Sequence, residues 1–281
     1  MRKPSPSDLT DGQWEVVKPL IPSSSVGRPR QVALREGLNT IFYQNRSGCQ
    51  GEMLPHDLWP QSTVSDSFAP GRDDGTGPEI LDAVRRPGRG AAAREPSPSA
   101  GRIDSPTVKT SEVAAERGSD GGQKITGRTR HLIGDTLGLL LVVVVTAASA
   151  DDGTVAPEVR GRLTPEHRTR LEVLWADGKY HNHHRDAGME GAKVRYRIEG
   201  VKRPLGSEGF VKLPGRWVVE RTFAGLGRSR RNSRDYERFA ESSEAMIKIS
   251  SIHRRLRLLK PDLSKEPVPF KYRELQGIIT G

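Results

Sequence analysis

Apolar residues recur at helical spacing near the N-terminus. Two stretches, 14–21 and 31–46, each carry apolar side chains on one face, and Gly48 is a natural helix stop after the second stretch. The residues between them are polar or turn-forming. The pattern therefore predicts a small all-α region within residues 1–68.

From residue 102 the apolar pattern changes. Short runs rich in β-branched residues alternate with stretches of helical periodicity, which is typical of an α/β domain over residues 102–262. The expected strands are 102–109, 129–134, 139–146, 171–176 and 193–201, and the expected helices are 165–171, 216–226 and 241–259.

Two segments lack both patterns. Residues 69–101 are rich in glycine, proline and arginine, and only 79–84 suggests a helix, so we expect mostly linker there. Residues 263–281 are expected to form a C-terminal tail. The sequence thus predicts a helical region, a linker, an α/β domain and a tail.

Composition narrows the class of protein. Of 281 residues, 34% are hydrophobic, a fraction that is low for a globular enzyme but too high for a fully disordered chain. The single cysteine, Cys49, excludes an internal disulfide framework and an all-cysteine metal site within one chain. The longest apolar run, 137–148, is shorter than the roughly 20 residues of a membrane helix, and the first residues lack a secretory apolar segment. We therefore expect a cytoplasmic protein with no membrane partner.

Positive charge is concentrated in one segment. The chain has a net charge of +10, and residues 201–260 hold 15 lysines and arginines against 6 acidic residues. A segment of this kind indicates a polyanion partner such as nucleic acid, with salt-dependent binding. A solvated basic surface that binds nothing in particular is the alternative.

Three carboxylates occupy positions suited to catalysis. Asp104 lies in the first expected strand of the α/β domain, Asp177 at the C-terminal end of a later strand, and Glu220 in a helix. Carboxylate oxygens are preferred ligands of Mg²⁺ and Mn²⁺, and two such ions can support phosphoryl transfer. Because the chain has 35 acidic residues, spacing alone does not single out this set.

Two alternatives stay open from the residues alone. Asp135 is a rival second carboxylate, although the sequence at 135–138 is also typical of a hairpin turn. A cluster of His181, His183 and His184 could bind a metal ion or occupy an exposed loop.

Several local sequences resemble bacterial transposases of the group named after insertion sequence five. Residues 103–110 (IDSPTVKT), 174–180 (LWADGKY) and 216–223 (RWVVERTF) are similar to the segments around that group's two catalytic aspartates and its catalytic glutamate. Arg28-Pro29-Arg30 resembles part of its N-terminal region. The resemblance extends over residues 8–66 and 94–260.

The resemblance implies an α/β fold, a ribonuclease-H-like mixed-sheet catalytic domain with a small N-terminal helical DNA-binding region. It implies a DDE transposase in which Asp104, Asp177 and Glu220 bind Mg²⁺ or Mn²⁺ and support strand cleavage and strand transfer at an element's terminal inverted repeats. The implied partner is double-stranded DNA, bound by a homodimer in the bacterial nucleoid. The arginines expected to contact DNA are Arg28, Arg30, Arg216, Arg221, Arg228, Arg230 and Arg231.

Some residues depart from the pattern of that group. Pro106 and Thr107 follow the first Asp-Ser, where the group has glutamine and serine, and Gly225 stands where it has tryptophan. Gly101 and Arg102 precede Asp104 where the group is apolar, and we expect the charge of Arg102 to disfavour burial of this strand. A glycine weakens a helix by about 1 kcal/mol. The alternative function is therefore a decayed, inactive relative that only binds DNA.

Overall fold

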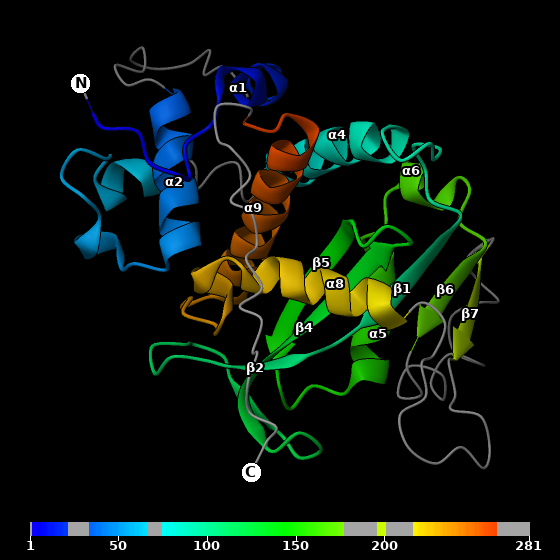
Figure 1. The fold of residues 1–281 in the computed structure, drawn as a ribbon. Coiled ribbons are helices and arrows are strands. Elements are labelled where there is room, and N and C mark those ends of the chain that lie inside the picture. Colours follow the sequence, from blue (N-terminus) through cyan, green and yellow to red (C-terminus); the bar gives the residue numbers. More distant parts are fainter. Residues whose placement is uncertain (1, 22–33, 67–74, 177–195, 201–215, 263–281) are drawn as a thin grey trace, which may run out of the picture.

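The computed structural model describes residues 2–21, 34–66, 75–176, 196–200 and 216–262 (Figure 1). In this part of the chain, helices pack on both faces of one mixed β-sheet, and the N-terminal helices lie to one side of it. The strands are β1 (Ala100–Asp104), β2 (Thr107–Lys109), β3 (Gly118–Asp120), β4 (Ile125–Asp135), β5 (Leu140–Ala147), β6 (Val173–Ala176) and β7 (Arg197–Gly200).

The pairing of the strands defines the fold. β4 pairs antiparallel with β5 on one side and with β1 on the other, β1 is parallel to β6, and β6 is parallel to β7. The short strands β2 and β3 pair with β4 as well. The order β5–β4–β1–β6–β7, with its switch from antiparallel to parallel at β1, is that of a ribonuclease-H-like sheet. The expected fold class is confirmed.

The described helices follow the sequence signals closely. Thr10 and Gln13 form a reciprocal capping box at the start of the first helix, and Gly48, with φ of +73°, ends the second. Residues 61–66 are also helical. The named helices are α1 (Asp11–Val17), α2 (Leu34–Ser47), α4 (Thr76–Gly90), α5 (Asp152–Gly161), α6 (Pro165–Arg168), α8 (Arg216–Gly227) and α9 (Ala240–Leu259), with the 3-10 turns η1 (Lys18–Leu20), η2 (Gly51–Met53) and η3 (Arg230–Asn232).

A tight turn joins β4 to β5. Asp135 Oδ1 accepts hydrogen bonds from the backbone amides of Leu137 and Leu139, both at 2.9 Å, and Gly138 adopts φ of +74°. The strand that follows is buried over 140–145, so the predicted core strand is confirmed. Among the described residues, no helix combines the length and apolarity needed to cross a bilayer.

Part of the expected linker at 69–101 is helical, because α4 spans Thr76–Gly90. The prediction of mostly irregular structure is wrong here, because α4 packs along α9 (Figure 1). A side chain at Gly88 would collide with the guanidinium of Arg255 on α9, so this glycine allows a close approach of the two helices rather than marking a loop. The buried apolar residues of α4 are Ile80, Leu81 and Val84.

Helix α9 lies in a hydrophobic cluster that joins distant parts of the chain. The cluster combines N-terminal residues with α4, one face of the sheet and α9, whereas the other face of the sheet packs on α5. The N-terminal helices and the sheet therefore hold fixed positions relative to one another. Contributors to the first cluster include Leu9, Val17, Phe42, Leu132, Val143, Ile247, Ile252 and Leu256.

We expect Ile247→Ala to lower the free energy of unfolding by about 2–5 kcal/mol, because the substitution leaves a cavity in this cluster. Ile247 is 0% exposed. Leu258→Ala on the same helix is the control, since that side chain is 60% exposed and its loss should cost less than about 0.5 kcal/mol. Urea unfolding followed by circular dichroism measures both; equal losses would contradict the packing of α9.

Two buried histidines couple stability to pH. Burial lowers the pKa of His131 in β4 to about 4, although Asp152 Oδ1 lies 3.6 Å from its Nδ1. Burial and the nearby charges of Arg257 and Arg46 lower the pKa of His253 in α9 to about 4. Both imidazoles are therefore neutral in the folded protein at neutral pH.

We expect the free energy of unfolding to fall between pH 6.5 and 5. In that window the two histidines are protonated in the unfolded chain but stay neutral in the folded protein. Each of them therefore lowers the free energy of unfolding by up to about 1.4 kcal/mol per pH unit. Glu244, whose pKa burial raises, acts in the opposite direction with at most one proton. Urea unfolding at several pH values checks this expectation, and a protein that becomes more stable toward pH 5 would refute it.

Candidate active site

Asp104 stands at the end of the central strand of the sheet. It is the last residue of β1, between β4 and β6, and its Oδ1 accepts a hydrogen bond from the Ser105 amide at 2.9 Å. β6 runs parallel to β1, with Trp175 opposite Arg102, so both strands end at the same edge of the sheet. The next residue after β6 is Asp177, which lies outside the described residues.

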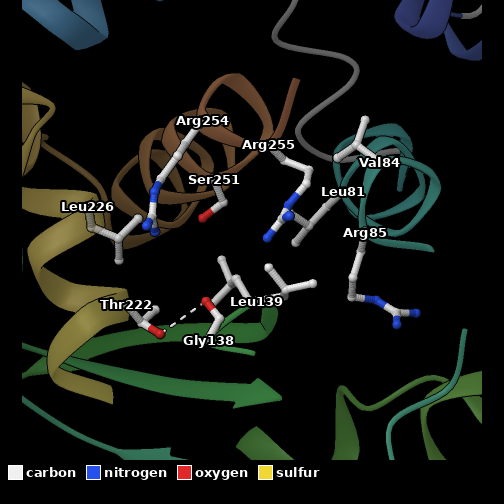
Figure 2. Close-up of a pocket in the computed structure, with 11 residues that line it drawn as sticks. Leu81, Val84, Arg85, Gly138, Leu139, Thr222, Leu226, Ser251, Arg254 and Arg255 are labelled. Atoms are coloured by element: carbon white, nitrogen blue, oxygen red, sulfur yellow. Dashed lines mark hydrogen bonds between the residues drawn. The ribbon is translucent and has the colours of Figure 1, made fainter. Parts of the chain in front are cut away.

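The third predicted carboxylate, Glu220, belongs to α8. This helix is attached to the sheet by Thr222, whose Oγ1 lies 3.1 Å from the carbonyl oxygen of Gly138 in the β4–β5 turn (Figure 2). The same Oγ1 lies 2.9 Å from the carbonyl oxygen of Val218. Leu226, one turn further along α8, is buried in the core with α9. The backbone of α8 is therefore held against the same sheet that carries Asp104.

The rival carboxylate, Asp135, is occupied by structural contacts. It is fully buried, and its Oδ2 accepts a hydrogen bond from Arg89 Nη1 at 2.5 Å while Oδ1 accepts the two turn amides. These contacts account for both oxygens and favour the turn interpretation. The other alternative, the cluster of His181, His183 and His184, lies outside the described residues.

The described part of the chain does not hold a complete metal site. Within it, no three His, Cys, Asp or Glu side chains lie close enough to bind an ion together. The predicted set depends on Asp177, which falls outside that part. The structure therefore places Asp104 and the backbone of α8, whereas Asp177 and the side chain of Glu220 lie outside what it describes.

The arginines expected to bind DNA have different surroundings. Arg221 and Arg228 line one pocket, whereas Arg231 is engaged with Glu237 at 2.6 Å. Arg230 is exposed in η3, and Arg216 is the first residue of α8. Arg28 and Arg30 lie outside the described residues. The same pocket contains three arginines that the sequence did not single out, namely Arg46, Arg254 and Arg257.

The departures from the transposase pattern have local explanations. Arg102 is buried, with 8% exposure, within an intact β1, so the expectation that its charge disfavours burial is wrong. Pro106 stands between β1 and β2, where a missing amide breaks no ladder. A side chain at Gly225 would overlap the guanidinium of Arg254, so the glycine makes room for that arginine.

A mixed sheet of this order, with a carboxylate at the end of its central strand, defines the ribonuclease-H-like class of nucleic-acid-processing domains. Residues 9–81 match the family described as "Putative transposase of IS4/5 family", and residues 95–253 match the family described as "Transposase DDE domain". The second match spans more than half of the chain. This protein therefore belongs to the family of transposase DDE domains, whose members generally use divalent metal ions.

One relative extends the comparison. The chain is similar to the "Putative transposase for insertion sequence element IS402" of Burkholderia cepacia, with 32% identity over 136 residues. The aligned stretch covers 44% of this chain and 60% of that protein. The chain thus spans less than two thirds of the relative's length.

We expect Asp135→Asn to lower the free energy of unfolding by about 3–5 kcal/mol, because it leaves the buried charge of Arg89 without its partner. Asp104→Asn should cost less than about 1 kcal/mol, since the side chain of Asp104 is only half-buried, whereas that of Asp135 is fully buried. Chemical unfolding of the two variants measures the difference. A large loss for Asp104→Asn would assign that carboxylate a structural role instead.

Proposed function

We propose that this chain is a transposase that cuts double-stranded DNA at the terminal inverted repeats of an insertion sequence and transfers the freed strand to a target. The observation that carries the proposal is the position of Asp104. This carboxylate ends the central strand of a DDE-family sheet, beside a parallel strand whose next residue is Asp177.

Asp104, Asp177 and Glu220 are the proposed ligands of Mg²⁺ or Mn²⁺. Three carboxylates suit these hard cations, and ions bound there would activate an attacking hydroxyl and stabilise the leaving oxygen. The role of the fold is to position these three carboxylates. Pairing of β1 with β6 aligns two carboxyl-terminal strand ends, and the contact of Thr222 with Gly138 holds α8 on the sheet.

The wider organisation is part of the same proposal. Residues 1–68 would recognise the element end, with Arg28 and Arg30 reaching DNA. Residues 69–101, which include α4, connect this region to a catalytic domain at 102–262, and 263–281 form a tail. We propose a homodimer on paired DNA ends, located with the bacterial nucleoid.

We expect Asp104→Asn, Asp177→Asn and Glu220→Gln each to reduce cleavage of inverted-repeat DNA at least a hundredfold while leaving DNA affinity within about twofold, because each removes a proposed metal ligand. Glu172→Gln is the control, since this exposed carboxylate stands just before β6, at the opposite end of that strand from Asp177. Cleavage with Mg²⁺, Mn²⁺ or EDTA, and gel-shift binding, provide the readouts.

The outcomes separate the two candidate functions. Normal cleavage by any of the three variants would refute its assigned role. Specific binding with no cleavage by the unaltered chain under every metal condition would favour the inactive, DNA-binding relative.

A further inference from the structure

A pocket rich in arginine lies where the N-terminal helices meet α8 and α9. Its volume is about 580 Å³, and it opens between the end of α2 and the two C-terminal helices. We call it the arginine pocket. Its arginines are Arg46 of α2, Arg221 of α8, Arg228 just after α8, and Arg254 and Arg257 of α9.

Helical spacing brings these residues together. Arg221 lies on α8 and Arg228 directly follows the last residue of that helix, whereas Arg254 and Arg257 are three residues apart on one face of α9. Gly225 lies between Arg221 and Arg228 and lacks the side chain that would displace the guanidinium of Arg254. The packing therefore accommodates the convergence of positive charge.

The positive charges in the pocket repel one another. Burial, followed by the charges of Arg257 and Arg228, lowers the pKa of Arg46. Burial, followed by Arg221 and Arg228, lowers the pKa of Arg254. In the part of the chain that the structure describes, no carboxylate forms an ion pair with any of the five arginines.

Other arginines of the protein are compensated. Arg128 contacts Asp235 and three carbonyl oxygens, Arg89 pairs with Asp135, and Arg231 pairs with Glu237. The arginine pocket differs from these sites because, among the described residues, no carboxylate pairs with its charges and they are open to a ligand. Guanidinium groups bind phosphate oxygens with charge-assisted, often bidentate hydrogen bonds.

We propose that the arginine pocket binds a backbone phosphate of duplex DNA, independently of base sequence. This inference rests on the proposed function for the choice of DNA among phosphate-bearing ligands. Because Arg46 comes from the N-terminal helices and the other four arginines from the segment 221–257, one bound DNA strand contacts both regions at once. The pocket contributes DNA affinity and its salt dependence, whereas the three proposed metal-binding carboxylates contribute strand cleavage.

The test uses the full chain and a random-sequence DNA duplex. We expect the triple variant Arg46→Gln, Arg254→Gln and Arg257→Gln to weaken binding at least tenfold at physiological salt and to reduce the slope of log Kd against log salt by about 1–3, at about 0.9 per lost phosphate contact. The control removes three exposed arginines outside the pocket, Arg86, Arg117 and Arg168, in the same way. The control variant has the same net charge as the triple variant. A smaller loss of DNA affinity in the control therefore assigns the difference to the position of the arginines in the pocket.

A second measurement guards against a folding defect. Because the pocket arginines repel one another, the triple variant should unfold at the same urea concentration as the unaltered chain or a higher one. A lower midpoint, or equal loss of DNA affinity in variant and control, would overturn the proposal.

Two further probes identify the source of the phosphate. Inorganic pyrophosphate that displaces DNA at micromolar concentration would assign the pocket to a small anion, and tighter pocket-dependent binding of an RNA duplex would assign it to RNA. Either result overturns the DNA assignment. Cleavage of inverted-repeat DNA is measured separately. If the unaltered chain cleaves DNA and the triple variant keeps its DNA affinity, only this inference is refuted and the proposed function stands.

Discussion

A buried carboxylate, Asp135, connects the elements on which the candidate site depends. Its Oδ1 shapes the turn between β4 and β5, and its Oδ2 receives Arg89 from α4. The turn that it shapes presents the Gly138 carbonyl to Thr222 of α8. A single charged side chain thereby joins the sheet to two helices, and α8 is the helix that contains Glu220. Since this turn lies outside the proposed metal site, the position of α8 is set by the fold and does not require a bound ion.

An element could be predicted from the sequence where neighbouring residues alone determine its structure. The run at 139–146 and the periodicity at 241–259 are features of neighbouring residues, so the sequence predicted β5 and α9 nearly to their ends. Helix α4 was missed because its glycines and prolines indicate a loop when neighbours alone are considered. Its stability comes from α9, and the role of Gly88 is visible only once Arg255 lies beside it.

The candidate site shows a similar division. Asp104 and Glu220 could be proposed because the resemblance to a family aligns local sequences in order, and the strand around Asp104 follows from the local pattern. The arginine pocket could not be predicted, because it requires α2 to lie beside α9, more than 180 residues later in the chain. Charge counting located the basic segment at 201–260. It could not distinguish Arg231, which pairs with Glu237, from Arg254, whose pKa is lowered by burial and by the charges of Arg221 and Arg228.

The packing of α2 and α9 in one hydrophobic cluster holds the arginines of the pocket close together despite their repulsion. α2 and α9 contribute to one hydrophobic cluster, so Arg46 cannot move away from Arg254 and Arg257 without disrupting that cluster. The repulsion among these guanidiniums is thus maintained by apolar burial elsewhere, at a cost in stability that a bound polyanion removes. A ligand that relieves this repulsion favours the arrangement in which the N-terminal helices are docked on the sheet. On the proposed binding of DNA in the arginine pocket, DNA binding and docking of these helices are coupled, because the repulsion of Arg46 by the other four arginines opposes docking and a bound phosphate offsets it.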